Sequence, residues 1–169
     1  MKIDPQTLRK IKVDHEKYVV KGMELIHAEA TRDSILEMLK SGDPVGALVK
    51  TLVMILHKVD EAARVAGIEV EDAAKLLGAG ELLNQLYEIG KAAKIMKLEP
   101  DELHLALAGG IQSYVKDEIA ANRIDPKKLA ATMKTNLSQL PEKDKAESLL
   151  VLKKIEQTGK KYAAKIGGR

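Results

Sequence analysis

The chain contains no cysteine, no tryptophan and no phenylalanine, and its only aromatic residues are four tyrosines. Without cysteine it can form neither a disulfide nor a thiolate metal site, and it has no thiol nucleophile. Without phenylalanine or tryptophan, a core must be filled by Leu, Ile, Val, Ala and Met. Such small aliphatic side chains let helices approach closely, and they favour helix-on-helix packing over a β-sandwich.

Long apolar runs are missing as well. The longest uncharged, apolar-rich stretch covers residues 103–115 and contains His104, Gln112 and Ser113. A membrane-spanning helix needs about 20 predominantly apolar residues. No apolar stretch follows the first residues of the chain, so we expect neither a membrane span nor a secretion signal.

Proline is scarce, and its five positions indicate where helices begin. Three prolines follow aspartate, one follows glutamate, and the last has no acidic residue before it: Asp4-Pro5, Asp43-Pro44, Asp125-Pro126, Glu99-Pro100 and Pro141. Proline suits the first helical turn, where its missing amide would be unpaired anyway. An acidic side chain just before it can cap the free amides and lies favourably at the positive end of the helix dipole.

Apolar residues recur at helical spacing after each of these starts, and no segment alternates over the length of a strand. The pattern predicts helices over residues 5–42, 44–67, 69–97, 100–122 and 126–139, and one more from residue 141. It leaves open whether the first helix is continuous through Ala30 or restarts within residues 31–34. We therefore predict an all-α, compact bundle of five to seven helices. Residues 1–42 form an extended N-terminal helical arm, residues 43–140 the helical core, and residues 141–169 a C-terminal helix and basic tail.

Glycines interrupt two of the predicted helices. Gly78, Gly80 and Gly90 lie within the segment 69–97, and Gly109 and Gly110 lie in the middle of the next. Because glycine inside a helix costs about 1 kcal/mol relative to alanine, these positions need a reason. Either the backbone breaks at residues 77–80, or the glycines allow close helix–helix approach, which we favour.

The glycine-marked faces also suggest how the protein assembles. We interpret Gly78, Gly80, Gly109 and Gly110 as a self-association seam, since an apolar helix face left over after folding can be covered by a neighbouring copy. The N-terminal arm, with its own apolar stripe, could serve the same purpose. The sequence therefore predicts a homo-oligomer.

The net charge of +3 is unevenly distributed. Residues 125–169 carry 11 Lys and Arg against 5 Asp and Glu, a net charge of +6. The basic side chains of the tail that could contact phosphates, in a non-specific and salt-sensitive mode, are Lys153, Lys154, Lys160, Lys161, Lys165 and Arg169. Tyr162 is the only aromatic residue there, which gives little support for base stacking. A solvated tail is the alternative.

Motifs for catalysis or cofactor binding are weak. Glu24-x-x-His27 is one half of the carboxylate–histidine set of a di-iron bundle, but no second copy exists. Residues 77–81 (LGAGE) lack the Gly-Lys-Ser/Thr ending of a phosphate-binding loop. We predict a protein that is not an enzyme, with no cofactor, no metal and no small-molecule substrate.

Four runs resemble small helical virion proteins of tailed bacteriophages. They are residues 39–45 (LKSGDPV), 47–49 (ALV), 59–63 (VDEAA) and 80–90 (GELLNQLYEIG), within a similarity that covers roughly residues 30–130. The resemblance implies a structural or ejected component present in many copies, in the virion or the host cytoplasm, with other virion proteins as partners. It implies a place in the portal–tail region or among the internal proteins, and it brings no catalytic residues. The alternative function is a nucleic-acid-associated protein that uses the basic C-terminal region.

Overall fold

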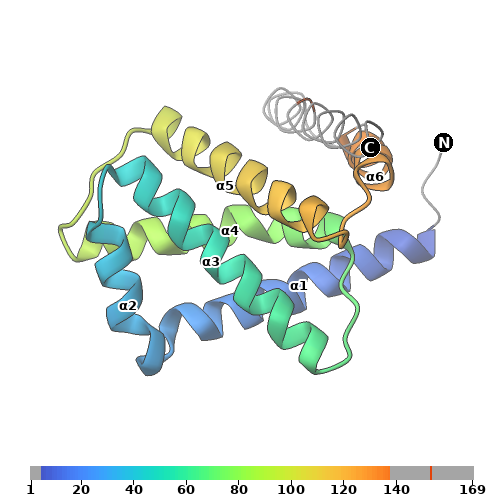
Figure 1. Cartoon of the computed structure of the whole chain (residues 1–169), viewed down its shortest axis with the longest axis horizontal. Helices are drawn as coiled ribbons and strands as arrows, with labels where there is room; N and C mark the ends of the chain where they lie inside the picture. The colour runs from blue at the N-terminus through green and yellow to red at the C-terminus, as the bar shows by residue number, and fades with distance from the viewer. Residues whose placement is uncertain (1–4, 138–152, 154–169) are drawn as a thin grey trace. The chain divides into compact units, whose positions relative to one another are not determined.

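The computed structural model describes residues 5–137 and residue 153, with side chains at 5–134 and 153. These residues form six α-helices and no β-strand (Figure 1). The helices are α1 (Pro5–His27), α2 (Glu29–Lys40), α3 (Pro44–Val65), α4 (Asp72–Ala92), α5 (Pro100–Ala120) and α6 (Pro126–Leu137). The all-α prediction is confirmed. The helix predicted from Pro141 lies outside the described residues.

Helix starts follow the acidic–proline pairs. The Asp43 carboxylate accepts a hydrogen bond of 2.7 Å from the backbone N–H of Gly46 at the start of α3. Asp125 accepts from the N–H groups of Lys127 and Lys128 at the start of α6, at 2.8 and 3.3 Å. At α5 the bond runs in the opposite direction, because the Glu99 backbone N–H donates to the Glu102 carboxylate at 2.9 Å. Each bond pairs an amide that the first helical turn leaves without a partner.

The chain divides into two compact units, Lys10–Ile111 and Met1–Arg9 with Gln112–Arg169. Within Lys10–Ile111, α3 packs against α2 on one side and α4 on the other. Leu48, Leu52, Ile55 and Leu56 of α3 are fully buried, so the widest apolar stripe in the sequence belongs to the central helix of this unit. Tyr18 of α1, 2% exposed, donates its hydroxyl to the Leu56 carbonyl oxygen at 3.2 Å.

The buried residues of the other unit, within the described range 112–134, come mainly from two helices. Tyr114 and Val115 of α5 are buried, and Leu129 and Met133 come from α6. The carboxylate of Glu118, whose side chain is 3% exposed, receives two bonds from the Arg123 guanidinium, at 2.7 and 2.8 Å. A bidentate pair of this kind offsets the cost of burying the carboxylate.

The structure answers one boundary that the sequence left open and corrects another. The first helix is not continuous, because Ala28 adopts an extended conformation with ψ of 135° between α1 and α2. The Thr31 hydroxyl holds this corner through bonds to the carbonyl oxygens of Leu25 and Ala28. The third segment ends at Ala92 and not near residue 97, since Lys94 turns the chain with a φ of 56°.

Candidate functional site

The four seam glycines lie in unbroken helices and face side chains of the same chain. A Cβ atom at Gly78 would lie 3.2 Å from Tyr18 and Val19, one at Gly109 3.1 Å from Val49, and one at Gly110 2.7 Å from Leu52. Gly80 has more room, with its nearest neighbour, Leu107, at 3.8 Å. Close helix approach therefore explains Gly78, Gly109 and Gly110, while a seam with a second copy stays a prediction.

A further close approach involves a glycine that the sequence pattern did not single out. Gly22 of α1 is buried, and a Cβ atom there would lie 2.5 and 2.7 Å from the two methyl groups of Leu82 in α4. Leu82 is itself fully buried. The rule applied to Gly78, that a glycine in a helical pattern needs a packing reason, would have found this contact between α1 and α4.

The predicted phosphate contacts lie almost entirely outside the described residues. Lys153 is described, and it is exposed. Lys154, Lys160, Lys161, Lys165 and Arg169 are outside the described range. Within the described range, α6 carries three more exposed lysines, Lys127, Lys128 and Lys134. They belong to the same basic C-terminal region.

Glu24 and His27 each contact a different residue of the same chain. Glu24 pairs with Lys21 at 2.8 Å, and the His27 Nε2 atom lies 3.0 Å from the side-chain nitrogen of Gln85. Among the described residues, no group of three or more His, Asp and Glu side chains is placed to hold a metal ion. Both residues of the motif therefore have partners in the protein itself.

A buried polar network joins α1, α3 and α4. The Asp60 side chain, 7% exposed, lies 3.6 Å from the Lys75 ammonium and 3.3 Å from the Tyr18 hydroxyl. Lys75 also pairs with Asp72 at 3.1 Å. Burial raises the pKa of the Asp72 carboxyl above its ordinary 3.8, and the nearby Lys75 charge only partly opposes this. The network therefore links α1, α3 and α4 through one ammonium group, two carboxylates and a hydroxyl.

A second charged cluster caps the start of α4 with a side chain from α1. The Asp14 carboxylate accepts from the Glu71 backbone N–H at 3.0 Å and from the Lys10 ammonium at 2.7 Å. The bond to Asp14 raises the pKa of Lys10. Because Asp14 lies 57 residues from Glu71 in the chain, no local motif could have revealed this cap.

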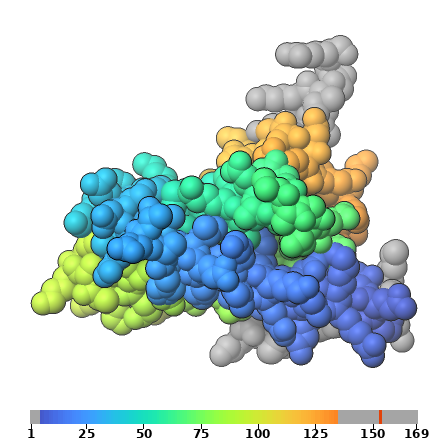
Figure 2. All heavy atoms as spheres, turned by 90° about the horizontal axis from the view of Figure 1, so that it is seen from below, coloured from blue at the N-terminus to red at the C-terminus, as the bar shows by residue number. Residues whose placement is uncertain are grey.

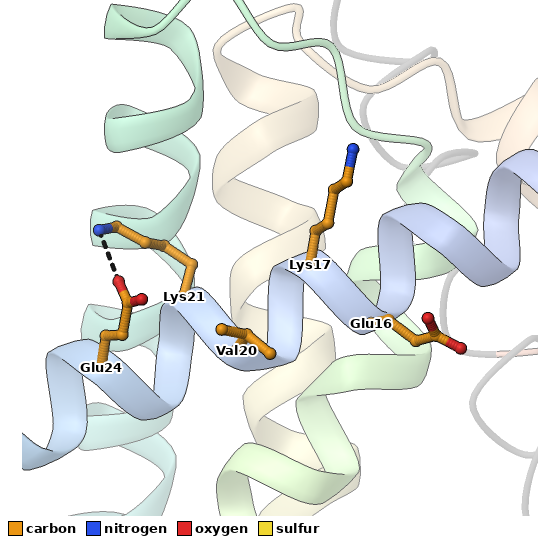
Figure 3. A pocket seen from close by; sticks show the side chains of 5 residues that line it. All are labelled: Glu16, Lys17, Val20, Lys21 and Glu24. Carbon is orange, nitrogen blue, oxygen red and sulfur yellow. Dashed lines mark hydrogen bonds and ion pairs between the residues drawn. The ribbon is translucent and has the colours of Figure 1, made fainter.

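The outer face of α1 carries exposed apolar side chains between charges. Val13 and Val20, seven residues apart, are 47% and 58% exposed. Beside Val20 is a shallow hollow of about 290 Å³, lined by Glu16, Lys17, Val20, Lys21 and Glu24 (Figure 3). We call Val13 and these five residues the α1 face. The blue atoms of α1 lie uncovered on the side of the protein seen in Figure 2.

None of the described helices is long and apolar enough to cross a membrane. Comparisons with protein-family models, with curated proteins and with solved structures find no match for this chain.

Proposed function

We propose that this protein is a non-enzymatic structural or assembly protein that self-associates through the α1 face. The observation that carries the proposal is the exposure of Val13 and Val20 on a helix whose other face is buried. Large apolar side chains left uncovered along one helix face are typical of an interaction surface. Gly78, Gly109 and Gly110 already contact their own chain, which makes the α1 face the better candidate for the seam.

The charges of the α1 face favour a second copy as its partner. Glu16 and Lys17 lie on one side of Val20 along the helix, and Lys21 and Glu24 lie on the other (Figure 3). In a twofold contact, the same patch is presented by both copies, so it must complement itself. A face with two carboxylates and two ammonium groups can pair each charge with its opposite on the other copy.

Residues 30–130 resemble virion proteins of tailed bacteriophages, and from this resemblance we infer where the protein acts. In that setting the protein is a multi-copy component of the particle, in the portal–tail region or among the internal and ejected proteins. Other virion proteins would then be further partners.

Light scattering on a sizing column, at low and at high salt, tests self-association. We expect a defined oligomer, and we expect Val20→Glu to reduce the mass to that of the monomer because it buries a carboxylate in the seam. Val65→Glu is the matched control, since Val65 is 86% exposed at the end of α3. A wild-type monomer at all concentrations, or an oligomer that Val20→Glu leaves intact, refutes the proposal.

A second candidate function is non-specific contact with DNA. The net charge of +6 on residues 125–169 and the exposed lysines of α6 favour it. Phosphate contacts release counterions, so affinity should fall steeply with salt. Deleting residues 153–169 should abolish binding to duplex DNA in a fluorescence anisotropy titration, whereas binding unchanged by the deletion refutes a role for the tail.

A further inference from the structure

A hollow of about 500 Å³ lies where the corner between α1 and α2 meets the end of α4. It is lined by Ile26, His27, Arg32, Ile35, Leu36, Ile89, Ala92 and Ala93. All of these residues belong to the unit Lys10–Ile111. The volume is within the range of roughly 300–1,000 Å³ that small-molecule sites occupy.

Six of the eight residues that line this hollow are apolar, and Arg32 brings a permanent positive charge to it. Ile26 and Ile35 are buried behind the lining, at 2% and 1% exposed, so the apolar surface open to a ligand comes from half-buried Leu36 and Ile89 and from exposed Ala92. Arg32 is exposed, and its guanidinium forms no hydrogen bond or ion pair with any side chain in the part of the chain that the structure describes. No Asp or Glu lines the hollow. The hollow therefore combines an apolar surface with one available positive charge.

This combination selects the chemistry of a ligand. A guanidinium presents two parallel donors that match the two oxygens of a carboxylate. A phosphate would need further cationic or amide donors, and Arg32 is the only Lys or Arg in the lining. Isoleucine and leucine walls favour an alkyl chain over a polar body.

We propose that the hollow binds a small amphipathic carboxylate, with its alkyl chain against Leu36, Ile89 and Ala92 and its carboxylate on Arg32. The site is independent of the α1 face and of self-association. His27, held by its contact with Gln85 at 3.0 Å, forms part of the wall beside the carboxylate end.

The corner that shapes the hollow is fixed before any ligand arrives. Thr31 bonds to the carbonyl oxygens of Leu25 and Ala28, and these bonds set the angle between α1 and α2. A site whose walls are already in place loses little conformational entropy on binding. The proposal therefore requires no rearrangement of the helices.

Isothermal titration of the full-length protein with sodium octanoate tests the proposal. We expect saturable binding at a single site. Octylamine, which has the same chain and the opposite charge, should not compete. Arg32→Gln should weaken octanoate binding about tenfold, the effect of one charge-assisted pair. Arg64→Gln, at an exposed arginine near the end of α3, is the matched control.

A second variant tests the hollow independently of Arg32. Ala92→Leu places a larger side chain in the wall at an exposed position in the last turn of α4, so it should block octanoate while the protein keeps its helical circular dichroism. The proposal is overturned if octanoate shows no saturable binding, if octylamine competes equally, or if neither Arg32→Gln nor Ala92→Leu weakens binding.

Discussion

Replacing Gly22 by alanine tests the closest helix contact of the unit Lys10–Ile111. The substitution has two opposing effects. Removing a glycine from a helix interior stabilises it by about 1 kcal/mol. The new Cβ atom would lie 2.5 Å and 2.7 Å from the two methyl groups of Leu82 and 3.1 Å from its Cγ, so rotating one methyl group away cannot relieve the contact.

The overpacking should outweigh the gain in helix propensity. Leu82 is fully buried, and inserting a methyl group into a filled core costs about 1–3 kcal/mol. We therefore expect Gly22→Ala to lower the free energy of unfolding by up to about 2 kcal/mol. Gly80→Ala is the matched control, because its nearest neighbour is an ordinary 3.8 Å away. It should raise the free energy of unfolding by up to about 1 kcal/mol.

Urea denaturation followed by far-UV circular dichroism measures both variants. Opposite signs for the two substitutions are the expected result. If Gly22→Ala stabilises the protein as much as Gly80→Ala does, then α1 and α4 do not approach as closely as described and the reasoning fails. Measuring the native mass of Gly80→Ala in the same experiment also tests the predicted seam at that glycine.

Further predictions concern helix ends and one buried carboxyl. Lys94→Gly should raise the free energy of unfolding by about 1 kcal/mol, because Lys94 adopts a φ of 56° that glycine tolerates better. Gly67→Ala, at a φ of 69°, should lower the free energy of unfolding by a similar amount in the same urea assay. Changes of the same sign for the two variants would contradict this account. Asp43→Ala should cost about 1 kcal/mol through loss of the α3 cap, seen as a lower urea midpoint, whereas an unchanged midpoint would show that the cap contributes nothing. The folded-state pKa of Asp72 is raised above 3.8, so as pH falls the folded protein binds this proton before the unfolded chain does. Wild type should therefore gain stability relative to Asp72→Asn as pH falls from neutral toward 3.8. Urea titrations across that range would contradict this direction if the difference in unfolding free energy between the two proteins stayed constant.

Much of the fold could be read from the sequence because the signals are local. Pro44, Pro100 and Pro126 are the first residues of α3, α5 and α6, since the geometry of proline suits a first turn whatever surrounds it. Apolar residues at helical spacing after Pro44 likewise predicted α3. These features depend on residues within one or two turns of each other.

The features that the sequence did not reveal depend on distant contacts or on missing signals. The break at Ala28 has no capping side chain and no glycine or proline, so the sequence left open whether the helix is continuous and offered a restart only at residues 31–34. Lys94, two residues after the end of α4, adopts a conformation that glycine usually adopts. Because this residue is not a glycine, the predicted helix was too long. The hollow beside Arg32 forms only when the end of α4 meets the α1–α2 corner, and this meeting is a property of the tertiary structure.

The scarcity of aromatic residues gives each unit its own optical reporter. With no tryptophan in the chain, near-UV absorption and fluorescence come from tyrosine. Tyr18, 2% exposed, lies in Lys10–Ile111, and Tyr114, fully buried, lies in the range 112–169. Tyr87 also belongs to the first unit and Tyr162 to the second. Replacing both tyrosines of one unit by phenylalanine leaves only the signal of the other, so a pair of double variants can follow the melting of each unit separately in an unlabelled protein.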